Sequence, residues 1–210
     1  MIIPVSKNAL ILAGIALVCV SILGLVNQLA QPRIAQQQLA NKLAILNDVL
    51  PQNSASASLL ADCVLVTQPQ LLGRPTPQAV YRLRDGEQIS AFVVETTAPD
   101  GYSGNIDLMV AVTPDGTILG SRVLNHQETP GLGDKIERRR SAWIDSFSGQ
   151  QVSQANKNNW AVKKDGGQFD QFTGATITPR AVIAAIYNAG LFVQQQPELA
   201  SRSANCEASL

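Results

Sequence analysis

Three kinds of hydrophobic pattern follow one another along the chain, and the first is a long run without charge. Residues 9–26 read ALILAGIALVCVSILGLV and contain no charged side chain. A helix of this length rises about 27 Å, close to the thickness of the hydrocarbon core of a membrane. The run is longer than the roughly 7–15 apolar residues of a cleaved signal peptide, and no A-x-A cleavage site follows it. We therefore expect a short N-terminal segment over residues 1–8 and a retained transmembrane anchor over residues 9–29.

The second pattern has the spacing of a helix face. Apolar side chains at positions 39, 43, 46 and 50 are separated by four and three residues. Pro51 cannot continue a helix, and the NSASAS sequence after it has the composition of a loop. The pattern predicts a stalk helix and a loop over residues 30–60.

Short segments rich in Val, Ile and Leu follow, and they are typical of β-strands. Asp85-Gly86 and Asp115-Gly116 separate neighbouring segments as hairpin turns do, and the GYSG sequence at 101–104 makes a third tight connection. Strands joined in this way pair antiparallel, so we expect one meandering sheet. The five expected strands are 62–68, 79–84, 88–96, 105–113 and 117–125.

Beyond the sheet the pattern becomes helical again. We expect a helix over residues 133–147, a further strand at WAVKK (160–164) and a final helix over residues 179–196, whose apolar positions 182, 183, 186, 187 and 193 share one face. The residues from 197 to 210 show no pattern, and a flexible tail is expected there. These elements predict an α+β fold, an antiparallel sheet packed by helices, in a domain spanning residues 61–196.

Composition and charge exclude several functions. The chain has 16 basic and 16 acidic side chains, so it lacks the basic excess that nucleic-acid binding requires. A single histidine, His126, without a G-x-S-x-G sequence argues against a hydrolase, and the scattered acidic residues argue against a metal site. Cys19 lies in the anchor. Cys63 and Cys206 either form a disulfide or remain as one buried thiol and one thiol on a loose tail.

The stretch DQFTGATIT at 170–178 places three threonines directly before the final helix. Thr178, followed by Pro179, is the expected N-cap of that helix. Thr173 and Thr176 have two interpretations: they stabilise the turn by local hydrogen bonds, or one of them holds a ligand. The helix N-terminus favours the ligand, because its unpaired N–H groups and its dipole attract an anion such as a phosphate.

The neighbours of Thr176 suit such a ligand. Gly174 and Ala175 are small and leave room for an approaching group. Arg180 offers a charge-assisted hydrogen bond. We therefore expect a phosphate at Thr176, with Thr173 and Arg180 as further contacts.

Two motifs resemble those of bacterial FMN-binding domains that carry covalent flavin. One is an acidic residue, two spacers and Thr-Gly-Ala-Thr; the other is ETPGLG, which in the family lies beside the flavin ring. The resemblance implies that a flavin transferase joins the phosphate of FMN to Thr176 by a phosphoester. The matching residues are Asp170, Thr173, Gly174, Ala175 and Thr176 in the first motif, and Glu128, Thr129, Pro130, Gly131, Leu132 and Gly133 in the second.

Within the second motif, further roles are expected from the residues themselves. The N–H groups of residues 131–133 are expected to form a nest that stabilises negative charge on a reduced ring. Leu132 is expected to pack on the ring face, and Glu128 to brace its loop.

From residue 5 to residue 195 the chain resembles the family of G subunits of Rnf ion-translocating electron transport complexes. The resemblance rests on the single N-terminal span, the stalk, the VKKDGG sequence and the length. It implies an electron carrier without substrate turnover of its own, in the inner membrane with its soluble domain on the periplasmic side. The implied partners are other membrane subunits of the complex, a flavin transferase and membrane lipid. The alternative is a membrane-anchored assembly or binding module without a redox cofactor.

Overall fold

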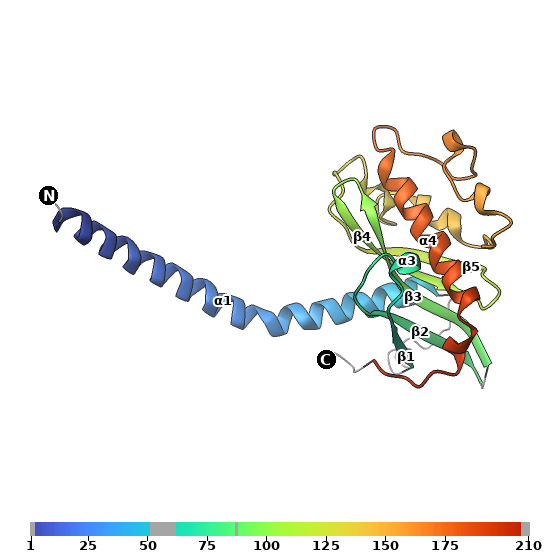
Figure 1. Ribbon diagram of the computed structural model, residues 1–210, viewed down its shortest axis with the longest axis horizontal. Coiled ribbons are helices and arrows are strands. Elements are labelled where there is room, and N and C mark those ends of the chain that lie inside the picture. Colours follow the sequence, from blue (N-terminus) through green and yellow to red (C-terminus); the bar gives the residue numbers. More distant parts are fainter. Residues whose placement is uncertain (1–2, 51–61, 87, 207–210) are drawn as a thin grey trace. The chain divides into compact units, whose positions relative to one another are not determined.

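The computed structural model describes residues 3–50, 62–86 and 88–206 (Figure 1). The chain forms two compact units, one before Lys42 and one from Lys42 onward. Helix α1 (Ile3–Val49) contributes to both units. The other elements are β1 (Cys63–Val66), α3 (Pro69–Leu72), β2 (Gln78–Asp85), β3 (Gln88–Gly101), β4 (Gly104–Val112), β5 (Ile118–Asn125), α4 (Ile177–Gln195), and the 3₁₀ helices η1 (Asp134–Ile136), η2 (Ala142–Phe147), η3 (Lys157–Asn159), η4 (Lys163–Asp165) and η5 (Pro197–Ala200).

The first unit is helical and apolar. Its stretch Lys7–Ile34 has a mean hydropathy of 2.9 and is long and apolar enough to cross a membrane. The single N-terminal spanning helix predicted from the sequence is thus confirmed as a helix of suitable length and composition. Helix α1 passes through Pro32 and ends at Val49; the loop expected after it, at NSASAS, lies outside the described residues.

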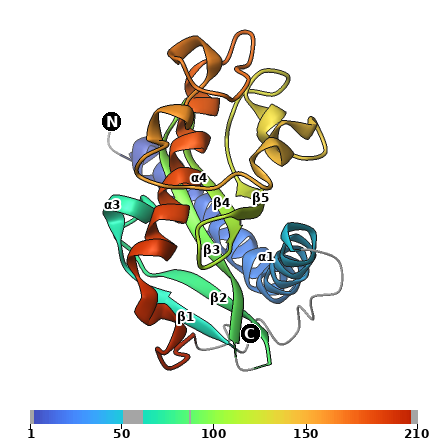
Figure 2. The same cartoon turned by 90° about the vertical axis from the view of Figure 1, so that its right-hand side faces the viewer.

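The second unit is built on the predicted antiparallel meander. Its five strands lie in the order β1-β2-β3-β4-β5, and each pairs antiparallel with the next (Figure 2). Asp85 lies opposite Gln88 and Gly101 opposite Gly104, so the tight connections fall where the sequence places them. Gly116 has a φ of +89°, which a residue with a side chain rarely adopts.

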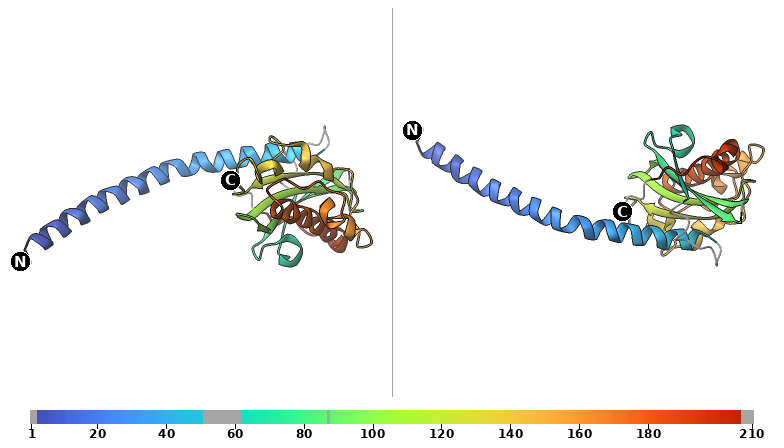
Figure 3. Two further views of the ribbon diagram at one scale, coloured as in Figure 1. Left: turned by 90° about the horizontal axis from the view of Figure 1, so that it is seen from above. Right: turned by 90° about the horizontal axis from the view of Figure 1, so that it is seen from below.

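Both faces of the sheet are covered. Alternate residues of each strand point to opposite sides, so each strand can contribute to two cores. Val80 and Val94 belong to the larger core, which includes most of α4. Tyr81 and Val93 belong to a smaller core with Leu46 and other residues at the end of α1. Figure 3 shows the sheet between α4 on one side and the last turns of α1 on the other. The apolar face predicted for the final helix is buried as expected.

Two elements between the sheet and α4 differ from the sequence prediction. The segment predicted as one helix over residues 133–147 forms the short 3₁₀ helices η1 and η2 instead. Between these two helices Glu137 and Ser141 have extended backbone, and the Ser141 hydroxyl caps η2 by accepting a hydrogen bond from the Trp143 N–H. The segment 160–164 is not a strand: it makes one isolated bridge and then enters η4. Its alternating apolar residues are buried in an aromatic cluster, so the pattern reflects core packing.

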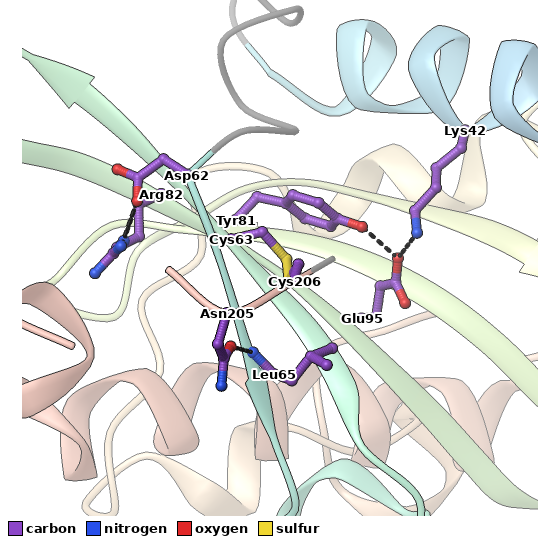
Figure 4. The surroundings of a disulfide bond; sticks show 9 residues. All are labelled: Lys42, Asp62, Cys63, Leu65, Tyr81, Arg82, Glu95, Asn205 and Cys206. Carbon is purple, nitrogen blue, oxygen red and sulfur yellow. Dashed lines mark hydrogen bonds and ion pairs between the residues drawn. A yellow bond between two sulfur atoms is a disulfide. The ribbon is translucent and has the colours of Figure 1, made fainter. Parts of the chain in front are cut away.

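The C-terminal segment is bound to the sheet and does not form the flexible tail that the sequence predicts. Cys63 and Cys206 form a disulfide, with their Cα atoms 5.4 Å apart (Figure 4). The side-chain oxygen of Asn205 accepts a hydrogen bond from the Leu65 N–H at 2.6 Å. The buried Arg82 donates to three carbonyls of the segment, those of residues 199, 200 and 202, and pairs with Asp62. These contacts hold residues 197–206 in place; residues 207–210 lie outside the described ranges.

The end of α1 is joined to the sheet by a polar contact as well as by its apolar face. Lys42 Nζ lies 2.7 Å from Glu95 Oε1, and the Tyr81 hydroxyl donates to the same carboxylate oxygen at 3.1 Å (Figure 4). Burial, together with the charge of Glu95, raises the pKa of Tyr81 to about 12. Tyr81 therefore stays protonated well above neutral pH and acts as a hydrogen-bond donor.

Candidate functional site

Thr176 lies directly before α4, at the N-cap position, and its side chain is exposed. Helix α4 begins at Ile177, and within the described part of the chain the Thr176 hydroxyl makes no capping bond to its helix. Its carbonyl accepts a hydrogen bond from Arg180 Nη1 at 3.0 Å. The other nitrogens of Arg180 bind the carboxylate of Asp165 at 2.5 and 2.9 Å. Thr176 thus presents an accessible hydroxyl, while Arg180 is already paired with a carboxylate.

Thr178 is not the N-cap that the sequence predicts. It is the second residue of α4 and 1% exposed, and its hydroxyl donates to Glu128 Oε2. Pro179 accordingly occupies the third helical position, which is tolerated because first-turn N–H groups have no partner inside the helix. The correction has a simple cause: α4 begins at Ile177, so Thr178 already lies inside the first turn, and its hydroxyl faces the buried carboxylate of Glu128.

Glu128 connects three segments of the site. Its side chain is buried, and Oε1 accepts a hydrogen bond from the Ser103 N–H at 2.9 Å while Oε2 accepts from Thr178. The carboxylate therefore joins the β3–β4 turn, its own loop and the start of α4.

Gly133 packs closely against the same carboxylate. A Cβ atom at this position would lie 2.9 Å from the Glu128 Cβ, 3.0 Å from Oε2 and 3.1 Å from the Thr178 hydroxyl oxygen. A side chain would therefore push the loop away from α4. This close approach requires glycine at the last position of the ETPGLG sequence.

The N–H groups of residues 131–133 do not form the anion-binding nest expected from the sequence. The Gly131 N–H donates to Asp134 Oδ1 at 2.8 Å. The N–H groups of Leu132 and Gly133 donate to the Thr129 carbonyl at 3.2 and 3.0 Å. All three donors are thus used inside the loop. These hydrogen bonds stabilise a tight turn, so only the side chains of the loop remain available to contact a ligand.

His126 fixes the start of this loop. The Glu128 N–H donates to His126 Nδ1 at 3.0 Å, so Nδ1 is an acceptor and the ring proton lies on Nε2. Nε2 lies 2.8 Å from Glu137 Oε1 and donates to it. Arg139, which also donates to Glu137, lowers the pKa of that carboxyl. Glu137 therefore remains ionised and holds the imidazole in one tautomer.

A cavity of about 270 Å³ opens beside Thr176. Its walls come from the β3–β4 turn, the ETPGLG loop and the start of α4. Tyr102, Leu132 and Ile177 line it with side chains that are 67%, 41% and 46% exposed. The lining residues are Tyr102, Glu128, Thr129, Leu132, Gly133 and residues 174–178.

The cavity brings together most of the site residues predicted from the sequence. Thr173, Gly131 and Arg180 are not among its lining residues. The sequence prediction missed Tyr102, Ile177 and Thr178. The GYSG turn was recognised only as a connection, and the apolar Ile177 next to the threonine was the available signal for a hydrophobic wall.

Replacing Thr178 by valine tests the contact between α4 and the loop. The variant keeps the side-chain shape but removes the hydroxyl that donates to the buried Glu128 carboxylate. We expect the free energy of unfolding to fall by about 1–3 kcal/mol, the usual cost of leaving a buried charged acceptor short of a donor. Denaturant unfolding of the detergent-solubilised chain measures this, and Thr173→Val, at an exposed position, is the matched control. Equal stability of the two variants would contradict the assigned contact.

Comparison with known proteins places these residues in a family. Residues 101–190 match the model of the FMN-binding domain, and residues 1–49 match that of the RnfG N-terminal region. The G subunit of the ion-translocating oxidoreductase complex of Pseudoalteromonas atlantica is 48% identical over 208 residues, covering 98% of this chain and 96% of that protein. The chain belongs to the family of these G subunits. Those of Yersinia pestis and Vibrio cholerae are each 47% identical, over 95% and 99% of this chain and the same shares of their own lengths.

The residues matched to the FMN-binding domain include all of those that line the cavity. The matched FMN-binding domain contains the β3–β4 turn, the ETPGLG loop and the start of α4, which are the three segments around the cavity. The family predicted from the two sequence motifs and the single N-terminal helix is confirmed.

Proposed function

We propose that this chain is the electron-carrier subunit of a membrane-bound ion-translocating oxidoreductase complex and that it carries FMN joined to Thr176 by a phosphoester. The observation that supports this most strongly is the accessible Thr176 hydroxyl at the mouth of the cavity, at the N-terminus of a helix of 19 residues. Bound FMN would accept and donate electrons, which the side chains around the cavity do not do by themselves.

The residues around Thr176 fit both parts of FMN. Tyr102, Leu132 and Ile177 supply apolar walls for a flat ring. The N-terminus of α4 supplies unpaired N–H groups and a dipole for a phosphate, although the dipole contributes only about 0.3–1 kcal/mol. Such weak binding leaves a non-covalent flavin dependent on its concentration, whereas a covalent bond removes that dependence.

The disulfide supports a periplasmic location for the second unit. Disulfides persist in oxidising compartments such as the periplasm and are rare in the cytosol. Cys63 and Cys206 form one in this unit. We therefore propose that helix α1 anchors the chain in the lipid of the inner membrane with Lys42 onward outside, beside other membrane subunits of the complex. The flavin transferase would act on the same side.

Fluorescence of the denatured chain tests the proposal. The full-length chain is produced with and without the flavin transferase, boiled in detergent, separated on a gel and illuminated with ultraviolet light. We expect a fluorescent band at the mass of the chain only when the transferase is present. A dark band with the transferase present would support an assembly or binding module without a redox cofactor.

A further inference from the structure

The Glu128 carboxylate is a buried charge in the wall of the cavity. The residue is 4% exposed, and its two oxygens accept hydrogen bonds from the Ser103 N–H and the Thr178 hydroxyl. Both donors are neutral. Two of the basic side chains that follow in the sequence are paired elsewhere, Arg139 with Glu137 and Arg140 with Asp134. Across the ranges that the structure describes, no cation forms an ion pair with Glu128.

A charge of this kind acts on whatever occupies the cavity. Water screens exposed charges efficiently, but a buried charge next to apolar walls is screened much less. A cation in contact would cancel most of the field, as Arg139 does for Glu137. Glu128 has only neutral donors, which stabilise its charge without removing it. A ring beside Thr176 would therefore lie in the field of one negative charge.

We propose that the charge of Glu128 sets the reduction potential of the flavin at Thr176, in addition to bracing the loop. This inference rests on the proposed function. One-electron reduction of a flavin held there, by a redox partner of the chain, would form no bond and break none, and would add negative charge to the ring. The negative charge of Glu128 opposes that change and keeps the potential low. The N-terminus of α4 acts in the opposite direction on negative charge near the phosphate.

A purely structural role for Glu128 makes a different prediction, so the charge must be separated from the contacts. Glu128→Gln removes the charge but keeps the size of the side chain and one acceptor oxygen. Glu128→Asp keeps the charge but shortens the side chain and disturbs the contacts. Asp107→Asn is the matched control, because Asp107 is paired with Arg74 and lies outside the cavity lining.

The experiment is a spectroelectrochemical titration of the flavin in the full-length flavinylated chain. For Glu128→Gln we expect the equilibrium constant of one-electron reduction to rise about tenfold, as Coulomb's law gives for a charge about 12 Å from the ring at an effective dielectric constant of about 20. Tenfold corresponds to a shift of the potential by about +59 mV. For Glu128→Asp and Asp107→Asn we expect a change of no more than about twofold.

Each outcome decides the proposal. A flavinylated Glu128→Gln variant with the potential of the unmodified chain overturns it, and so does an equal shift in Asp107→Asn. If Glu128→Gln fails to fold or to retain flavin, Glu128→Asp tests the proposal alone: a tenfold change with the charge retained overturns it. Hydrogen exchange of residues 126–134 in the flavin-free chain shows whether Glu128→Gln leaves the loop intact. Absence of flavin from the unmodified chain would instead contradict the proposed function.

Discussion

Thr176→Ala is expected to abolish covalent flavin completely while leaving the fold unchanged. The hydroxyl oxygen of Thr176 is the proposed attachment atom, so no phosphoester can form without it. The side chain is exposed and makes no capping bond to its helix in the described part of the chain, so we expect the free energy of unfolding to change by less than about 0.5 kcal/mol. Fluorescence on a denaturing gel measures the flavin, and denaturant unfolding measures the stability.

Two variants serve as controls for this result. Thr173→Ala removes the other exposed hydroxyl of the stretch and is expected to keep the full fluorescence, because Thr173 does not line the cavity. Thr176→Ser keeps a hydroxyl at the attachment position and is expected to keep part of it. If Thr173→Ala is dark and Thr176→Ala is fluorescent, the attachment site is assigned to the wrong residue.

Cys206→Ser is expected to produce the largest loss of stability. The disulfide joins residues separated by 143 positions, so it removes much of the conformational freedom of the unfolded chain. Long loops of this kind correspond to about 3–5 kcal/mol in the chain-entropy account. The variant also releases the covalent tie of the C-terminal segment to β1. Denaturant unfolding of the detergent-solubilised full chain measures the difference.

Cys19→Ser is the matched control for this experiment. Cys19 is the free, exposed cysteine in the apolar stretch of α1, and its replacement is expected to leave the unfolding of the second unit unchanged. Reduction of the unmodified chain is expected to reproduce the loss seen in Cys206→Ser. A Cys206→Ser variant as stable as the Cys19→Ser variant would show that the disulfide contributes little.

The sheet and the last helix are the parts of the fold that follow most directly from the sequence. Their signals are local: glycine turns such as Asp115-Gly116 fix the meander, and a continuous apolar face fixes α4. The segment between them is governed by contacts that the local pattern does not contain. The expected helix is replaced by η1 and η2, where Trp143 Nε1 donates to the Asp170 carbonyl, and packing against aromatic residues accounts for the apolar alternation at 160–164.

The same distinction applies to the site and to the C-terminal segment. Thr176 is identified by its position before α4, which is visible in the sequence. The partner of Thr178 is Glu128, fifty residues away, so local pattern alone favours the N-cap that the structure does not show. The C-terminal segment has no periodic pattern of its own. It is held by Arg82 and by a disulfide to Cys63, both of which lie more than a hundred residues earlier.

The most direct test of the attachment site is mass spectrometry of the chain purified from its native membrane. After proteolysis, the account predicts that the peptide containing residues 170–178 carries the mass of FMN less one water and that fragmentation places the addition on Thr176. The same peptide recovered entirely without the addition, or with the addition on Thr173 or Thr178, would contradict the account.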